Sequence, residues 1–293
     1  MCLKPLRYFQ MKRIFSLLLA AVIGSVAVCA SDDREVIERP VVSAYTLEAG
    51  TAHIAQTYLS PLRYSGPMLA LSYERMQAMR FDPERWVMRL SGRLDGARTR
   101  NNPARNALMW NLNLNLGWSM MRRWNMGPWS LYGGCYTSVE GGLLYVPRNS
   151  NNPVAAKAAW NVGITASAVY HTSLFGKKLT LRYLGELPLT GVFFSPEYGE
   201  LYYEIYLGNH KGIVRGAWPG NYFKLNNLVS ADIALGRTIL RLGYRCNIAS
   251  TKTNNIVCRH IEHSAVVGVA SEWISLSPTR KPDPDARYIS AMY

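Results

Sequence analysis

The chain has 293 residues, of which 48% are hydrophobic and 18% are charged, and its formal net charge is +14. The length allows one large domain or two small ones, and apart from one short N-terminal segment no stretch has the roughly 18 uninterrupted apolar residues of a transmembrane helix. The sequence has no zinc-finger or helical recognition pattern, so we expect no nucleic-acid partner and favour anionic lipid head groups or anionic solutes as partners of this basic chain.

The first thirty residues have the pattern of an export signal. Lys12-Arg13 precede an apolar run from Ile14 to Val28, and Ala30 is a small residue of the kind that precedes a cleavage site. We therefore predict a signal peptide over residues 1–30. Its removal takes away four basic residues and no acids, which leaves a charge of +10. An uncleaved anchor helix and a lipoprotein attached through Cys29 are the alternatives.

Residues 31–42 are polar and charged and include Pro40, and we predict a flexible lead-in over residues 31–48. The clearest strand follows later, from Trp110 to Trp118, where apolar residues alternate with polar or small ones over nine positions. Eight steps of about 3.3 Å, tilted by about 40°, rise about 20 Å, close to the apolar band of an outer-membrane barrel. We interpret this stretch as a strand with one face toward lipid and its asparagines toward a wet lumen.

The same alternation recurs in segments that are often longer than the strands of soluble proteins. Ten segments show it: 51–60, 68–79, 85–95, 107–121, 129–145, 158–174, 178–187, 228–235, 238–247 and 261–276. The connections between them alternate between short and long, as the turns and loops of a membrane barrel do. We predict an all-β protein with a single antiparallel transmembrane β-barrel over residues 49–276, with both termini in the periplasm of a bacterium and a C-terminal tail over 277–293. Twelve strands, or a soluble sandwich or lipocalin-like barrel, are the alternatives.

Parity along the strands assigns side chains to the two faces of the barrel wall. The residues expected to face the lumen are Arg89, Arg93, Asn111, Asn113, Asn115, His171, Arg182 and Arg241. The residues expected to form an aromatic girdle at the membrane interfaces are Trp86, Trp110, Trp118, Trp160 and Trp273. The sequence thus predicts a polar, arginine-rich lumen.

The connection over residues 188–227 is too long and too aromatic for a loose loop. Ser195 suits the N-cap of a helix, Pro196 the first helical position and Gly208 the C-terminal stop, which predicts a short helix in this outer loop. The helix carries Glu197, Glu200, Tyr202 and Glu204. Two interpretations stay open: a lid or plug whose acids meet the lumen arginines, or a surface helix that covers the mouth.

This insertion also carries the most specific part of a family resemblance, F-S-P-E-Y-G-E-L-Y-Y-E-I from Phe194 to Ile205, together with R-L-G-Y from Arg241 to Tyr244. With the signal peptide, these motifs resemble a family of bacterial outer-membrane barrel proteins classed as a domain of unknown function. The resemblance covers most of the chain after the signal peptide. It implies a localisation and a fold, and it brings no catalytic residues.

Few residues form patterns that carry chemistry. Cys246 and Cys258 flank a predicted loop symmetrically, so a disulfide between them and a pair of free thiols are both open. His260 and His263 point to opposite faces of a strand, so we expect no shared metal, and we find no motif for a cofactor. His171, Ser173 and Glu186 share the inward parity but lie too far apart along the hairpin for a catalytic triad.

We therefore expect a non-enzymatic barrel that is structural, or that binds an anionic solute or lipid head groups, or that acts as a narrow channel. Ten strands enclose little space, and side chains fill much of it, which favours a plugged or ligand-binding barrel over an open pore. The alternative is a lipid or peptide hydrolase that acts through the outer loops, where Glu197, Glu200 and His210 are the available groups.

Overall fold

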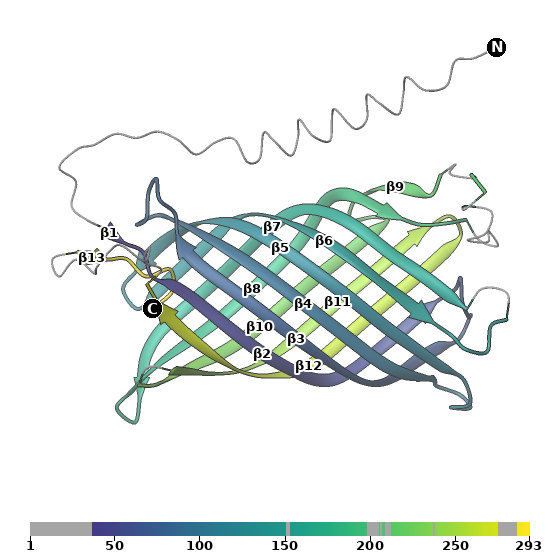
Figure 1. The fold of residues 1–293 in the computed structure, drawn as a ribbon, viewed down its shortest axis with the longest axis horizontal. Helices are drawn as coiled ribbons and strands as arrows, with labels where there is room; N and C mark the ends of the chain where they lie inside the picture. Colours follow the sequence, from purple (N-terminus) through teal and green to yellow (C-terminus); the bar gives the residue numbers. More distant parts are fainter. Residues whose placement is uncertain are drawn as a thin grey trace, which may run out of the picture. The chain divides into compact units, whose positions relative to one another are not determined.

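The computed structural model of the chain is all-β (Figure 1). It describes residues 37–150, 153–197, 205, 207–208, 212–236, 238–274 and 286–293. The predicted signal peptide and much of the predicted helix over 195–208 lie outside these residues. Within them, no helix is long and apolar enough to span a membrane.

Ten long antiparallel strands form one closed barrel, with β8 and β10 pairing to complete the circle. The strands of the barrel are β2 (Val41–Gln56), β3 (Arg63–Ala78), β4 (Trp86–Asn101), β5 (Leu108–Met126), β6 (Trp129–Tyr145), β7 (Val154–Leu174), β8 (Lys177–Phe194), β10 (Tyr222–Leu235), β11 (Thr238–Thr253) and β12 (Ile256–Trp273). Three short strands are added: β1 (Ile37–Glu38), β9 (Val214–Ala217) and β13 (Arg287–Tyr288). The predicted fold class and the count of ten barrel strands are confirmed.

The wall of the barrel separates an apolar outside from a polar inside. Apolar side chains that alternate along the strands are exposed on the outer surface, and they include Leu47, Leu69, Leu71, Leu112, Leu114, Leu116, Ile164, Val229, Val267 and Val269. A 16-residue strand such as β2 rises about 40 Å at the usual tilt, which exceeds the apolar band of about 25 Å. The barrel is therefore a transmembrane β-barrel whose strands continue beyond the membrane.

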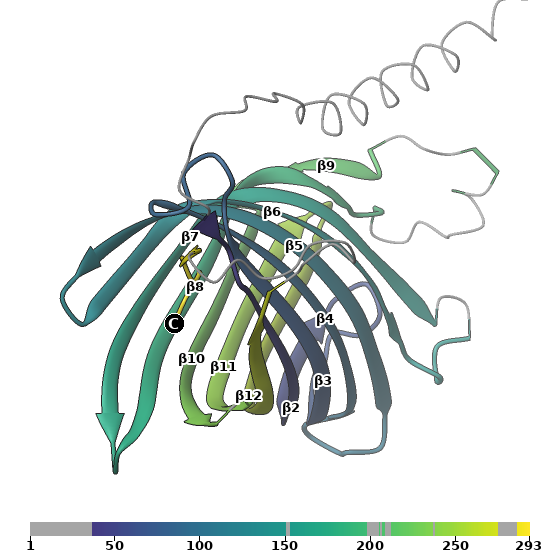
Figure 2. The ribbon, with the colours of Figure 1, turned by 60° about the vertical axis from the view of Figure 1, so that its left-hand side comes forward.

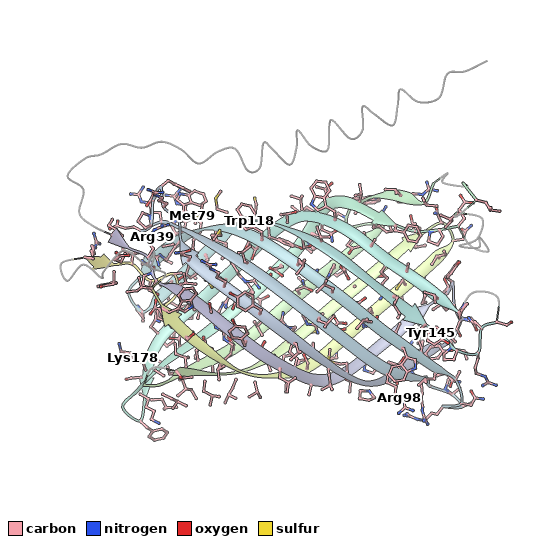
Figure 3. The ribbon with its side chains drawn as sticks, viewed as in Figure 1. Arg39, Met79, Arg98, Trp118, Tyr145 and Lys178 are labelled. Carbon is pink, nitrogen blue, oxygen red and sulfur yellow. The ribbon has the colours of Figure 1, made fainter. Side chains whose placement is uncertain are left out.

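The two ends of the barrel differ in their connections. At one end, which we call the turn end, the strands are joined at 79–85, 127–128, 175–176 and 236–237, and β2 begins and β12 ends there. At the other, the loop end, the connections are 57–62, 102–107, 146–153, 195–221 and 254–255. Figure 3 shows Arg39, Met79 and Lys178 toward the turn end and Arg98 and Tyr145 toward the loop end.

The first barrel strand begins earlier than predicted. β2 starts at Val41, so residues 41–48 of the expected flexible lead-in are part of the wall and pair with both β3 and β12. The sequence of residues 41–48 has no clear strand pattern, because it ends in a charged residue, Glu48. In the structure Glu48 is buried and points into the barrel. Its partners lie on other strands and leave no local signal.

The β11–β12 connection is also shorter than predicted. The expected long loop over 248–260 is a two-residue turn at Asn254-Asn255, because the strands run on to Thr253 and resume at Ile256. Both asparagines have positive φ, 51° and 59°, as a type I′ hairpin turn requires. Asparagine tolerates this conformation better than most residues with a side chain.

The outer insertion is largely an extension of the wall where the structure describes it. β8 continues to Phe194, β9 pairs with its end, and β10 resumes after a turn over 218–221. The Asn254 side chain donates hydrogen bonds to the carbonyl oxygens of Ser195, at 2.9 Å, and Pro196, at 3.4 Å. The β11–β12 turn thereby fixes the start of the outer loop.

The C-terminal residues fold back against the turn end of the barrel instead of forming a free tail. β13 pairs in parallel with β1, and the last residues follow it toward the interior. Figure 2 shows the C-terminus beside the turn ends of the strands. Ala291 and Met292 are almost fully buried.

We expect Asn255→Val to lower the free energy of unfolding by about 1–3 kcal/mol, because a β-branched residue at positive φ is strained. Asn255→Gly serves as the matched control and should leave stability unchanged or raise it slightly. Urea unfolding of the refolded barrel would measure both. Equal stability of the two variants would contradict this turn geometry.

Candidate functional site

The interior of the barrel is filled by layers of side chains, beginning with an apolar layer at the turn end. Its buried members are Val42, Met76, Val87, Met121, Tyr132, Val169, Ala291 and Met292. The Tyr132 hydroxyl donates to the carbonyl oxygen of Ala291 at 3.0 Å, and Arg123 donates to that of Ser290 at 2.5 Å. The C-terminal segment, residues 286–293, thus closes this end of the lumen.

Glu74 organises the next layer. Its carboxylate accepts hydrogen bonds from Arg89 on β4, Arg182 on β8 and Arg241 on β11, at 2.5 to 2.8 Å. Arg241 also forms a bidentate pair with Asp232, at 2.7 and 2.8 Å. One carboxylate on β3 therefore ties three strands together across the lumen.

The C-terminal tyrosine joins this layer. The Tyr293 hydroxyl donates to Asp232 Oδ2 at 2.6 Å. Burial and the neighbouring Asp232 carboxylate raise the pKa of Tyr293, so its hydroxyl keeps the proton that it donates. The last residue of the chain is thereby bonded to the charged interior.

A second charged layer lies nearer the loop end and is centred on Arg93. Its guanidinium contacts Glu48 at 3.1 Å, Asp95 at 2.7 Å and Glu262 at 2.9 Å. Arg245, on β11, contacts Glu48 at 2.9 Å from the other side of β12. The remaining acceptor sites are used as well, since the amides of Asn111 and Asn113 donate to Asp95 and that of Asn247 donates to Glu262.

A third group lies closer to the loop end. Lys224 contacts Glu140 at 2.6 Å, and the Tyr222 hydroxyl lies 3.3 Å from the same carboxylate. Lys157, on the neighbouring strand β7, donates to Asn111 Oδ1 at 3.3 Å. This group marks the change from the charged interior to a more apolar outer part.

The charges of these layers nearly balance within the part of the chain that the structure describes. The carboxylates are Glu48, Glu74, Asp95, Glu140, Glu186, Asp232 and Glu262, and the cations paired with them are Arg89, Arg93, Arg182, Lys224, Arg241 and Arg245. The lumen arginines therefore meet acids of neighbouring and facing barrel strands. Glu197 of the outer loop is instead exposed and lies 3.7 Å from Arg215, while Glu200, Tyr202 and Glu204 lie outside the described residues.

The described side chains leave an inner and an outer cavity between them. The inner cavity, of about 80 Å³, lies among the charged layers and is lined by Arg93, Asn113, Asn115, Lys224, Arg245 and Glu262, among others. The outer cavity, of about 90 Å³, lies toward the loop end. Each is large enough for several water molecules, and both are lined by Glu140, Ala249 and His260, so they adjoin.

Of the residues expected to face the lumen, Arg89, Asn111, Asn113, Arg182 and Arg241 are buried in these layers, and Arg93 and Asn115 line the inner cavity. His171 lies apart, near the turn end, where its Nδ1 is 3.4 Å from the Thr180 hydroxyl. Glu186 stands opposite Thr165, six residues along β7 from His171, or about 20 Å.

Four tryptophans lie at the turn end. Trp86 begins β4, Trp129 begins β6 and Trp273 ends β12, while Trp124 lies near the end of β5. Trp110 lies near the loop end of β5 and stacks with Arg98, 5.7 Å from ring centre to guanidinium carbon. Trp118 and Trp160 are exposed but lie within their strands, and Figure 3 places Trp118 away from both ends of the barrel.

The disulfide considered between Cys246 and Cys258 is not formed, and both residues are free thiols. Cys246 is paired with His263 in the β11–β12 ladder and Cys258 with Thr251, five rows apart. The two side chains also point to opposite faces, because Cys258 lines the outer cavity whereas Cys246 alternates with inward Arg245. This register arises because β11 and β12 stay paired up to the turn at Asn254-Asn255, so Cys246 and Cys258 are not opposite each other.

The H-I-E-H segment divides between the two faces. His260 points inward and lies 3.1 Å from Glu262, while His263 points outward and bonds to the Tyr244 hydroxyl at 2.6 Å. Among the described residues, no group of three or more His, Cys, Asp or Glu side chains is placed to hold a metal ion. His210 lies outside the described residues.

A closed antiparallel barrel with an apolar outside and a charged inside defines the class of transmembrane β-barrels. The chain matches the family model "Protein of unknown function (DUF3316)" over residues 14–280 and belongs to that family. No curated protein sequence matches it.

Solved structures with some similarity are outer-membrane proteins. The outer membrane protease OmpT from Escherichia coli is 7% identical, with 84% of this chain and 99% of that chain covered and a TM-score of 0.42. Neisserial surface protein A is 13% identical, with 78% and 96% covered and a TM-score of 0.30. The translocator domain of the autotransporter NalP from Neisseria meningitidis is 9% identical, with 90% and 95% covered and a TM-score of 0.34.

We expect Glu74→Gln to lower the free energy of unfolding by about 3–5 kcal/mol, because it removes the carboxylate that pairs with buried Arg182 and leaves Arg89 and Arg241 with one carboxylate partner each. Glu84→Gln is the matched control, since Glu84 pairs with Arg287 on the exposed surface at 2.8 Å. We expect almost no change there. Urea unfolding followed by tryptophan fluorescence would measure both, and similar values for the two variants would contradict a central role for Glu74.

Tyr293→Phe should cost about 1.5–3 kcal/mol, because it removes a hydrogen bond to a buried carboxylate. Tyr288→Phe changes an exposed tyrosine of the same segment and is the control. Hydrogen exchange of residues 286–293 would show whether the segment has loosened. Unchanged protection in Tyr293→Phe would show that the Asp232 contact does not hold the C-terminus.

Proposed function

We propose that this chain is a non-enzymatic barrel of the bacterial outer membrane that is closed to free diffusion and binds a ligand reached from its loop end. The observation that carries this proposal is the filling of the lumen by the Glu74 and Arg93 layers and the C-terminal segment. Buried pairs of this kind hold side chains from facing strands in fixed positions, because separating them would leave charges uncompensated.

Outer-membrane residence is supported by the exposed apolar side chains around the barrel and by the aromatic residues at the turn end. We propose that residues 1–30 are an export signal. In barrels of this class the short turns face the periplasm, so the turn end, with the start of β2 and the C-terminus, is the proposed periplasmic end. The loop end then faces outward.

A binding role is supported by the two adjoining cavities on the outward side of the Glu74 layer. Polar and charged groups converge on them, which is typical of sites that fix the orientation of a small ligand. We propose an anionic solute or the head group of a lipid as that ligand. The lumen arginines already bind carboxylates of the barrel. The positive charge that could bind an anionic ligand is therefore Lys157, nearer the loop end.

We expect the purified full chain to give no stepwise current in a planar lipid bilayer, since the layers of ion pairs and the C-terminal segment fill the lumen. An open porin reconstituted in the same way would serve as the positive control. Protein recovered from the bilayer vesicles should be folded and inserted, as judged by protease resistance of the barrel. Steady ohmic steps from the native chain would refute the closed barrel.

A further inference from the structure

The wall of the barrel is interrupted between β8 and β10 toward the loop end. β8 pairs with β10 only from Leu179 to Glu186, and from Gly191 to Phe194 it pairs with β9 instead. Residues 187–190 have no strand partner on this side among the described residues, and residues 222–225 at the start of β10 pair only with β11. Pro188, which has no N–H to donate, lies at the interruption.

The interruption faces an apolar environment. The exposed outward side chains beside it are Leu189 and Val192 on β8 and Phe223 on β10. Backbone without regular pairing is costly where it meets lipid, and it is tolerated where it lines a cavity. We therefore expect the unpaired backbone edges of residues 187–190 and 222–225 to be covered by something other than a neighbouring barrel strand.

The outer cavity reaches the β10 edge of this interruption, since Tyr222 lines it, whereas residues 187–190 do not. Ala155, Ala159, Phe193, Tyr222 and Ile256 form apolar parts of its lining. Phe193 and Tyr222, which come from the two separated strands, stack with their ring centres 5.1 Å apart. The cavity thus reaches the point where β8 and β10 diverge and is apolar on that side.

The outer cavity also carries charge beside this apolar lining, because Lys157 lies on the same strand face as Ala155 and Ala159. Lys157 lines it and donates to Asn111, and among the described residues no carboxylate lies within 4.0 Å of its ammonium. Glu140 also lines the cavity, but Lys224 compensates its charge at 2.6 Å. Within the part of the chain that the structure describes, Lys157 is therefore an inward cation without a carboxylate partner, next to an apolar pocket.

The roof of the cavity is fixed in place. Ser195 and Pro196 line it, and Asn254 holds the carbonyl oxygens of both. A ligand here meets a pocket lined by Ser195, Pro196 and the cation Lys157, with Tyr222 at the β10 edge of the interruption.

We propose that the outer cavity binds a single-chain amphiphile with an anionic head group, a carboxylate or a phosphate. Lys157 holds the head group, and the acyl chain runs along Ala159 and Phe193 to the interruption between β8 and β10 and into the surrounding lipid. This inference rests on the proposed ligand-binding function and names its ligand class.

The test is native mass spectrometry of the full chain in a neutral detergent, with dodecanoate, dodecyl phosphate and dodecanol as probes. We expect one bound dodecanoate or dodecyl phosphate per chain and no bound dodecanol. Lys157→Met should weaken this binding by about tenfold or more, because it removes a charge-assisted contact. Lys252→Met, an exposed lysine at the same end of the barrel, is the matched control and should bind as the native chain does.

Each outcome decides the proposal. Binding of either anionic probe supports it, and the preferred probe tells a fatty-acid carboxylate from a phosphate head group. Equal binding of dodecanol, or equal binding by Lys157→Met and the native chain, would overturn it. A silent barrel that binds neither anionic probe would refute this inference alone, whereas a conducting barrel would refute the proposed closed state.

Cys258 gives an independent measurement of location, because its thiol lines the same cavity. In a chain whose other cysteines are replaced by serine, dodecanoate should slow alkylation of Cys258 by a small maleimide. Ala159→Phe, which fills the cavity, should slow alkylation without any probe and abolish binding. A rate that dodecanoate leaves unchanged would place the ligand elsewhere and overturn the proposal.

Discussion

The compensation of buried charge is the constraint on which the arrangement of this barrel depends. A charge alone in the lumen would cost several kcal/mol, so the charged side chains of the Glu74 and Arg93 layers lie beside partners on the same, neighbouring or facing strands. Glu74 shows the consequence, because it binds arginines from β4, β8 and β11 at once. Hydrogen bonds in the wall order neighbouring strands, and these pairs across the lumen fix strands that are not neighbours.

The same constraint makes the two ends of the lumen different. At the turn end the apolar layer contacts Met292, and Tyr293 reaches past it to Asp232, so this end is filled by the chain itself. At the loop end the layers give way to alanines and aromatic rings around a cavity. A molecule approaching from the loop end would meet Lys157 before it met any fully paired arginine.

Local patterns allowed the wall to be predicted, and pairings across the lumen were beyond them. Alternation along Trp110 to Trp118 predicts two faces because the period of two is a property of the strand alone. The inward side of Arg89, Arg182 and Arg241 follows from the same parity. Their partners do not, because the residue that faces Glu74 depends on how the strands are staggered when the barrel closes. The start of β2 before Glu48 and the contact of Tyr293 with Asp232 were missed for that reason.

The paired interior and the interrupted wall follow from one rule, that polar groups away from water need partners. Where the chain supplies both partners, as at Glu74 and Arg93, the lumen is filled and fixed. The described barrel strands give Lys157 no carboxylate partner and give residues 187–190 no pairing strand on the β10 side. The missing partner of each has to come from outside these strands. An amphiphile meets the need at Lys157 with its charge and covers the interruption with its chain. Lys157 and Tyr222, at the β10 edge of the interruption, both line the outer cavity, so a single molecule is able to reach both features.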